Sequence, residues 1–176
     1  LDAETRVQVR ERVRDALTAE GATALLVTHD REEALSLADH VAVVRSGRVV
    51  QAGPPALVHD TPADADVARS LGPVSLLPVL DDTGADVDTP LGRLPVGTRT
   101  GAADHVLLRP EQVVATAPGG ATATGTVTGV RYRGGDAVLT VAVAGRAVEA
   151  CTTDRDLRVG DDVALRVIGP VHLLGG

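Results

Sequence analysis

The sequence predicts an α/β segment over residues 1–72, followed by an all-β region over residues 73–176. In the first part, stretches with helical periodicity alternate with short apolar runs, an order typical of α/β proteins. Beyond Gly72-Pro73 the helical periodicity ends. Short apolar runs then follow one another, separated by Gly, Pro or Asp about every 8 to 12 residues, which is typical of a small β-barrel or sandwich. We therefore predict a domain boundary at 72/73.

The first predicted element is an amphipathic helix that begins at Asp2, a residue suited to the N-cap, and runs to about Glu20. Apolar residues recur at helical spacing between Val9 and Leu17, and Gly21 ends the helix.

Ala22–Thr28 is a short apolar run bounded by turn residues, and it predicts a buried parallel strand. A second helix is expected from Asp30, because Asp30 and Glu33 have the spacing of a capping box.

Two further strands and two helices complete the α/β segment. The runs 41–45 and 48–52 predict a hairpin that turns on Ser46-Gly47. A short helix is expected from Pro54 to Val58, and another over Ala63–Leu71.

Eight strands are expected in the second region, because each is an apolar run bounded by turn residues. They are Val74–Leu80, Gly92–Val96, His105–Arg109, Thr122–Tyr132, Ala137–Ala144, Arg146–Cys151, Asp162–Ile168 and Val171–Leu174.

The amino-acid composition of the chain argues against several classes of function. The net charge is −7 and neither half of the chain is basic, so nucleic acid is a poor partner. Tyr132 is the single aromatic residue, which also argues against base stacking.

Cys151 has no partner for an internal disulfide, and a half-buried strand residue in a reduced compartment is favoured over a nucleophile. No apolar run has the roughly 18 residues of a membrane span.

The most informative residues for function are Thr28-His29-Asp30. They place an imidazole at the carboxyl end of the predicted strand, and ligands of open α/β sheets bind outside such strand ends. A histidine there can donate to phosphate oxygens, although a purely structural hydrogen bond is the alternative. The remaining histidines show no spacing of metal ligands, so no metal site is expected.

Residues 1–62 resemble the segment that follows the Walker B glutamate in ABC transporter ATPases. Leu1-Asp2 matches the end of the distal loop and Val27–Asp30 the switch loop. Asp39–Pro54 matches the family's A-D-x-V-x-V-(x)2-G-x-(V/I)-x-Q-x-G-(T/P)-P pattern, and Val58–Pro62 a helix ending at proline. This resemblance implies the C-terminal part of a P-loop NTPase domain. It further implies that His29 is the switch histidine, which contacts the γ-phosphate and positions the attacking water. Asp2 is implied at the subunit interface, near the second nucleotide.

Three motifs of that family are missing from the sequence. There is no phosphate loop, no LSGGQ-like signature and no strand ending in Asp-Glu. ATP and Mg²⁺ are therefore cofactors of the parent protein only, and we expect this chain alone neither to hold them nor to hydrolyse ATP. The chain also contains no methionine and starts at Leu1, so we interpret it as part of a longer protein.

Residues 73–176 resemble the TOBE regulatory domain of importer ATPases, which is built on an OB-like barrel. The matching segments are Gly92–Val96, Leu107–Gln112 and Val159–Leu165. The Leu-Arg-Pro-Glu-Gln form within the second is similar to the ferric-iron and polyamine branches. For Arg109 and Glu111, an ion pair at a strand end and an interface role are equally open.

The leading hypothesis is a part of the ATP-hydrolysing subunit of a bacterial ABC importer, with ferric iron as a candidate solute. It implies permease subunits and a second ATPase subunit as partners, in a homodimer at the cytoplasmic face of the membrane. The alternatives are a β-barrel module that senses a small ligand and a purely structural dimerisation domain. Because residues 1–72 alone would leave strand edges and an apolar helix face exposed, we also expect this chain to associate.

Overall fold

The computed structural model describes residues 3–118 and 123–175, which fold as two compact units, Leu1–Asp60 and Thr61–Gly176. The division falls at 60/61, ahead of the predicted boundary at 72/73. Residues 61–73, which we call the connector, pack on the β-rich unit and belong to it. The predicted boundary marks the end of helical periodicity, whereas the division in the structure follows the clustering of contacts within each unit.

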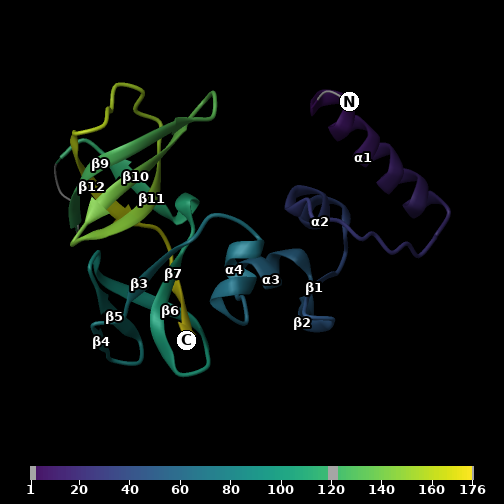
Figure 1. The fold of residues 1–176 in the computed structure, drawn as a ribbon, viewed down its shortest axis with the longest axis horizontal. Helices are drawn as coiled ribbons and strands as arrows, with labels where there is room; N and C mark the ends of the chain where they lie inside the picture. Colours follow the sequence, from purple (N-terminus) through teal and green to yellow (C-terminus); the bar gives the residue numbers. More distant parts are fainter. Residues whose placement is uncertain (1–2, 119–122, 176) are drawn as a thin grey trace. The chain divides into compact units, whose positions relative to one another are not determined.

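The first unit contains three helices and one hairpin among its described residues (Figure 1). Their bounds are α1 Ala3–Ala19, α2 Arg31–Leu37, β1 Val41–Arg45, β2 Arg48–Gly53 and α3 Pro55–Asp60. Ser46 and Gly47 have φ values of 51° and 74°, the left-handed pair that a two-residue hairpin turn requires. These elements agree with the sequence prediction to within one or two residues.

The predicted strand Ala22–Thr28 is wrong. This stretch follows α1 as a loop without strand pairing, and Leu25 and Val27 are 93% and 88% exposed. A parallel strand needs neighbours that supply its hydrogen bonds. The described strands of this unit, β1 and β2, pair with each other.

The second unit is mostly β and has two sheets (Figure 1). Five strands close a barrel in the order β10-β11-β8-β12-β9, and six form a sheet in the order β3-β7-β13-β6-β5-β4. The bounds of the sheet strands are β3 Ser75–Pro78, β4 Asp81–Asp82, β5 Asp86–Thr89, β6 Gly92–Thr100, β7 Ala103–Leu108 and β13 Val171–Gly175. The barrel strands are β8 Val113–Thr116, β9 Ala123–Tyr132, β10 Ala137–Val143, β11 Arg146–Thr152 and β12 Asp162–Val167. Helix α4 spans Ala65–Ser70, and a 3₁₀ turn spans Pro110–Gln112.

The barrel is confirmed, but the prediction of one all-β body misses the separate six-stranded sheet. It also misses β4, β5 and β8, which have only two to four residues each. Such short runs carry little alternation, and long-range pairing makes them strands.

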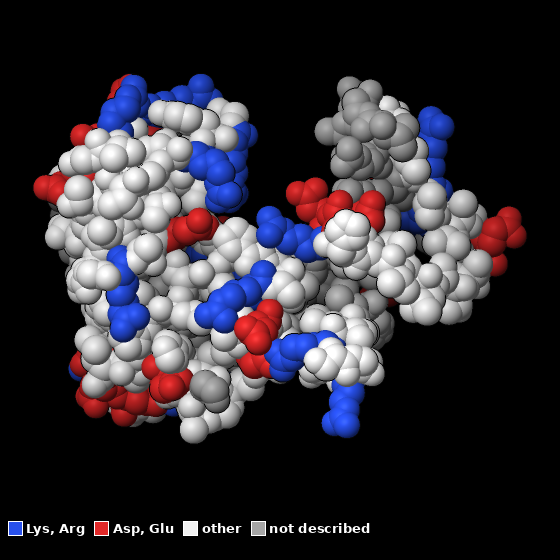
Figure 2. Space-filling model, in the orientation of Figure 1, with Lys and Arg blue, Asp and Glu red and all other residues white. Residues whose placement is uncertain are grey.

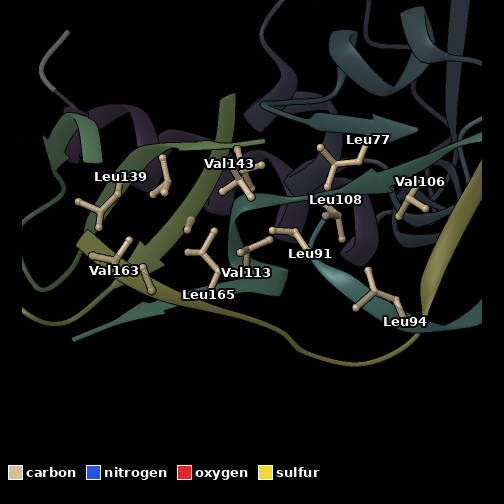
Figure 3. Close-up of a cluster of buried hydrophobic side chains, with 14 of the residues drawn as sticks. Leu77, Leu91, Leu94, Val106, Leu108, Val113, Leu139, Val143, Val163 and Leu165 are labelled. Atoms are coloured by element: carbon tan, nitrogen blue, oxygen red, sulfur yellow. The ribbon is translucent and has the colours of Figure 1, made fainter. Parts of the chain in front are cut away.

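One continuous apolar core joins the barrel to the sheet (Figure 3). Leu139 and Val163 line the barrel, and Leu77 and Val106 lie on the sheet. This core contains aliphatic side chains only, as the composition requires.

The six-stranded sheet has a second, outer face. Leu107 on β7 and Leu174 on β13 point to it, while their neighbours Leu108 and Leu173 point into the main core. Helix α4 covers this outer face through Ala68. The connector is thus a structural layer of the β unit.

Candidate functional site

His29 lies on a tight turn that leads into α2. The Asp30 N–H donates to the Thr28 hydroxyl over 2.9 Å, and that hydroxyl donates to a Glu33 carboxylate oxygen over 2.8 Å. Asp30 Oδ1 accepts from the N–H groups of Glu32 and Glu33, which makes Asp30 the predicted N-cap. His29 itself is exposed. The turn therefore fixes the backbone around His29 and leaves its imidazole accessible.

The structure tests only part of the predicted nucleotide contact. Asp2 lies outside the described residues. His29 follows a loop instead of the predicted strand, so no sheet edge gathers further groups around it within the described chain.

The other four histidines differ in burial and in their contacts. His40 is exposed, His59 contacts Asp60 at 2.8 Å, and His105 contacts Asp104 at 2.7 Å. His172 is buried in the second unit. Over residues 3–118 and 123–175, no group of three or more His, Cys, Asp or Glu side chains is arranged to hold a metal ion.

A pocket of about 300 Å³ opens in the barrel between β8 and β11. These strands run parallel and pair at Cys151 and Val114. The lining is mainly apolar with hydroxyl groups and two carboxylates. It consists of Val114, Ala115, Thr116, Ala117, Asp136, Cys151, Thr152, Thr153 and Asp154. Sequence reasoning missed this site, because its walls come from strands far apart in the chain.

Cys151 is a half-buried strand residue, as the sequence indicated. Burial raises the pKa of its thiol, and nearby carboxylates such as Asp136 act in the same direction against the opposing effect of Arg133. The thiol form dominates at neutral pH, so this cysteine is a poor nucleophile.

Charges on the face of the second unit shown in Figure 2 form small separate groups of both signs. Arg99 makes a two-point contact with the Asp82 carboxylate and also donates to the Gly84 carbonyl oxygen. The Arg99 hydrogen bonds lower the pKa of Asp82 to about 2. Arg93 on β6 makes a similar two-point contact with the Asp88 carboxylate on β5. These two ion pairs link the short strands β4 and β5 to β6.

No helix in the described part of the chain combines the length and apolar character needed to cross a membrane.

The sequence of this chain is similar to a known domain family and to several known proteins. The TOBE domain family matches residues 106–173. The Fe(3+) ions import ATP-binding protein FbpC of Pseudomonas fluorescens is 39% identical over 99% of this chain and 52% of its own length. FbpC 1 of Rhodococcus jostii is 38% identical over 96% of the chain and 51% of its own length. FbpC of Serratia marcescens is 36% identical over 100% of the chain and 52% of its own length. The chain therefore spans about half the length of these relatives.

Among solved structures, the cytoplasmic molybdate-binding protein ModG with molybdate bound aligns with a TM-score of 0.41 and 16% identity. The alignment covers 59% of this chain and 96% of ModG.

The family resemblance inferred from the sequence is confirmed. Residues 106–173 match the TOBE domain family, and the chain is similar, over nearly its whole length, to the C-terminal part of ferric-iron import ATP-binding proteins of the ABC class.

Proposed function

We propose that this chain is part of the ATP-hydrolysing subunit of a bacterial ABC importer, and that the complete protein couples ATP hydrolysis to solute uptake. The observation that carries the proposal is the similarity to ferric-iron import proteins along 99% of the chain. Because those relatives are named for Fe(3+) import, ferric iron is the proposed solute.

His29 is the proposed switch histidine. Its accessible imidazole on a hydrogen-bonded turn suits a residue that meets a phosphate supplied from outside this unit. In a phosphoryl transfer, a positioned imidazole donates to a γ-phosphate oxygen or orients the attacking water. Asp2 is proposed at the interface with a second subunit.

The remaining nucleotide contacts must come from elsewhere in the complete protein, since this sequence has no phosphate loop and no Asp-Glu strand end. ATP and Mg²⁺ would supply the phosphoryl group and its charge neutralisation there. The proposed partners are permease subunits and a second ATP-binding subunit, at the cytoplasmic face of the membrane.

The second unit is proposed to regulate transport. The pocket between β8 and β11 supports a ligand-sensing role as the second candidate function, because its lining combines apolar contacts with hydroxyl groups. Calorimetric titration of the chain with ferric citrate, molybdate, sulfate and spermidine tests this role. Heat that disappears in Val114→Phe, which adds bulk at a half-buried lining residue, while circular dichroism shows the variant to be folded, supports sensing. No heat with any ligand favours a structural dimerisation role.

Uptake of radioactive ferric iron tests the proposed transport function. A strain that lacks the complete gene is complemented with the wild-type gene or with His29→Ala. We expect the wild type to restore uptake and His29→Ala to leave it near the deletion level, with equal protein amounts on immunoblots. Full uptake in the deletion strain would contradict the proposal.

A further inference from the structure

Arg158 lies between the barrel strands β11 and β12, on a turn whose backbone is fixed at several points. Its N–H donates to Asp161 Oδ2 over 2.7 Å, and the Asp161 N–H donates to the Arg158 carbonyl oxygen over 3.1 Å. The turn is also tied to β9, because Val127 accepts from the Gly160 N–H and donates to the Asp161 carbonyl oxygen, each over 2.8 Å. Leu157, directly before Arg158, is buried in the main core. The backbone that carries the Arg158 side chain is therefore held in one place.

The guanidinium group of Arg158 is also held, and its acceptors are neutral. Its Nη1 lies 2.7 Å from the Arg155 carbonyl oxygen, 3.1 Å from the Leu157 carbonyl oxygen and 3.3 Å from the Tyr132 hydroxyl. The Arg155 side chain in turn donates from Nη2 to the carbonyl oxygen of Gly134, in the turn between β9 and β10. These contacts pre-organise the Arg158 side chain, which lowers the entropy cost of binding a ligand there.

The side of the guanidinium formed by Nε and Nη2 has no acceptor in the described part of the chain. Arg93 uses the same two nitrogens to hold the Asp88 carboxylate, at 2.8 Å and 2.9 Å. The Tyr132 hydroxyl accepts from Arg158, so its own hydrogen can point to a further acceptor. Two parallel N–H donors beside a hydroxyl donor match the oxygens of a carboxylate.

The carboxylates of the same loops do not neutralise this group directly. Asp161 Oδ2 accepts from the Arg158 backbone, and Asp154 Oδ1 accepts from the Asp156 N–H over 2.9 Å. Within residues 3–118 and 123–175, no ion pair joins an Asp or Glu to the guanidinium of Arg155 or Arg158.

The charges around the site favour a ligand with a single negative charge. Segments 131–136 and 153–161 together contain four arginines and four aspartates, so they add up to no net charge. A surface of this kind has no strong field that would attract multiply charged anions, and the aspartates would repel a second negative charge. Binding must then depend on directed hydrogen bonds over a short range.

We propose that Arg158 and Tyr132 form a binding site for one carboxylate group. Arg158 Nε and Nη2 donate to its two oxygens, and the Tyr132 hydroxyl donates to one of them. Tyr132 and Val159 are 57% and 64% exposed, so they offer apolar contact to the carbon chain that carries the carboxylate. A free carboxylic acid and an acidic side chain of another protein share this chemistry, and the test separates them. Neither Arg158 nor Tyr132 lines the pocket between β8 and β11, so the inference depends neither on ligand sensing there nor on transport.

NMR titration of the isotope-labelled 176-residue chain at constant ionic strength tests the site. The Arg158 Nε–H signal and the Tyr132 ring signals should shift in a saturable way with acetate and with the peptide acetyl-Leu-Glu-Leu-amide. The uncharged peptide acetyl-Leu-Gln-Leu-amide should cause no shift, and the divalent anion sulfate should bind more weakly than acetate. Tighter binding of the Glu peptide than of acetate identifies a protein side chain as the source of the carboxylate. Equal or weaker binding of that peptide identifies a free carboxylic acid.

Two variants separate the hydrogen-bond geometry from charge. Arg158→Lys keeps the charge but loses the paired donors, so its affinity for acetate should fall about tenfold. Tyr132→Phe keeps the ring and removes the hydroxyl donor, which should weaken binding about threefold. Each variant is followed through the signal that remains, and its backbone spectrum shows whether it is folded. Arg146→Lys, at an exposed arginine of β11, is the matched control and should bind acetate like the wild type.

Four results would overturn the carboxylate site. They are the absence of a saturable shift with acetate and with the Glu peptide, tighter binding of sulfate than of acetate, wild-type affinity in both Arg158→Lys and Tyr132→Phe, and an equal loss of affinity in Arg146→Lys.

Discussion

Arg109 Nη1 donates to the carbonyl oxygen of Ala68 over 3.0 Å, across 41 residues of sequence. The same nitrogen lies 3.2 Å from the Pro73 carbonyl oxygen, and Arg109 is only 3% exposed. The guanidinium therefore binds the C-terminal part of α4 to the end of β7. The sequence left open an ion pair with Glu111 or an interface role for Arg109, whereas these hydrogen bonds give it a structural role with backbone carbonyl groups as acceptors.

Replacing Arg109 with methionine should destabilise the second unit by about 3 kcal/mol, because the buried Ala68 carbonyl and the partly buried Pro73 carbonyl lose a charged donor. Urea unfolding measures the change. Arg146→Met, an exposed arginine on β11, is the matched control and should stay within about 0.5 kcal/mol of the wild type. Equal stability of the two variants would refute the anchoring role.

Gly125 on β9 lies too close to β10 to carry a side chain. An added Cβ would lie 2.6 Å from the Ala142 carbonyl oxygen and 2.7 Å from methyl groups of Val141 and Val143. Gly125→Ala should therefore lower the free energy of unfolding by about 1–3 kcal/mol. Gly135→Ala, where nothing lies within 4 Å, should be nearly neutral. A stable Gly125→Ala barrel in thermal unfolding would show that the two strands can move apart.

Asp82 should make stability depend on pH in strong acid. Its folded pKa, about 2, is below the ordinary value of 3.8 because Arg99 holds the carboxylate. A lowered acid pKa contributes stability above the ordinary pKa and loses it as pH falls through the folded value, here from about pH 4 to about pH 2. Asp82→Asn should flatten this part of the stability profile, and the neighbouring Asp81→Asn should not. High salt should weaken the difference, because the pair is partly exposed. Identical profiles for the two variants would contradict the assignment.

Local patterns predicted four of the five barrel strands, β9 to β12, and missed β8. Expected bounds for β10, β11 and β12 agree with the structure to within one residue, because apolar alternation ends at turn residues on both sides. The run 22–28 carries an equally strong apolar signal, yet it is exposed. Strand formation depends on pairing partners, which composition does not reveal.

The same limit applies to the candidate sites: local features could be predicted, whereas contacts between residues distant in sequence could not. The exposed turn at His29 follows from the local Thr-His-Asp sequence, and the Asp30 cap was predictable. The contact between Thr98 and His172 joins residues 74 positions apart, and the pocket needs β8 and β11 together. Neither the Thr98–His172 contact nor the pocket produces a periodic pattern in the sequence.

The exposed apolar loop should make this chain associate. Leu25 and Val27 expose 93% and 88% of their surfaces, and exposed apolar segments tend to be buried by association with other molecules. The double variant Leu25→Glu, Val27→Glu should shift the mass measured by light scattering toward the monomer. Val159→Glu, at a single exposed valine of the second unit, should leave the mass unchanged. A wild-type chain that is already a uniform monomer would count against this prediction.

ATP turnover by the complete subunit, with His29 replaced by alanine, tests the central claim most directly. Loss of one transition-state contact should lower kcat about 100-fold or more, while nucleotide binding, followed by fluorescence of a labelled ATP, stays within about threefold. His40→Ala, an exposed histidine of the same unit, should leave both quantities near wild type. Unchanged turnover in His29→Ala would contradict the account.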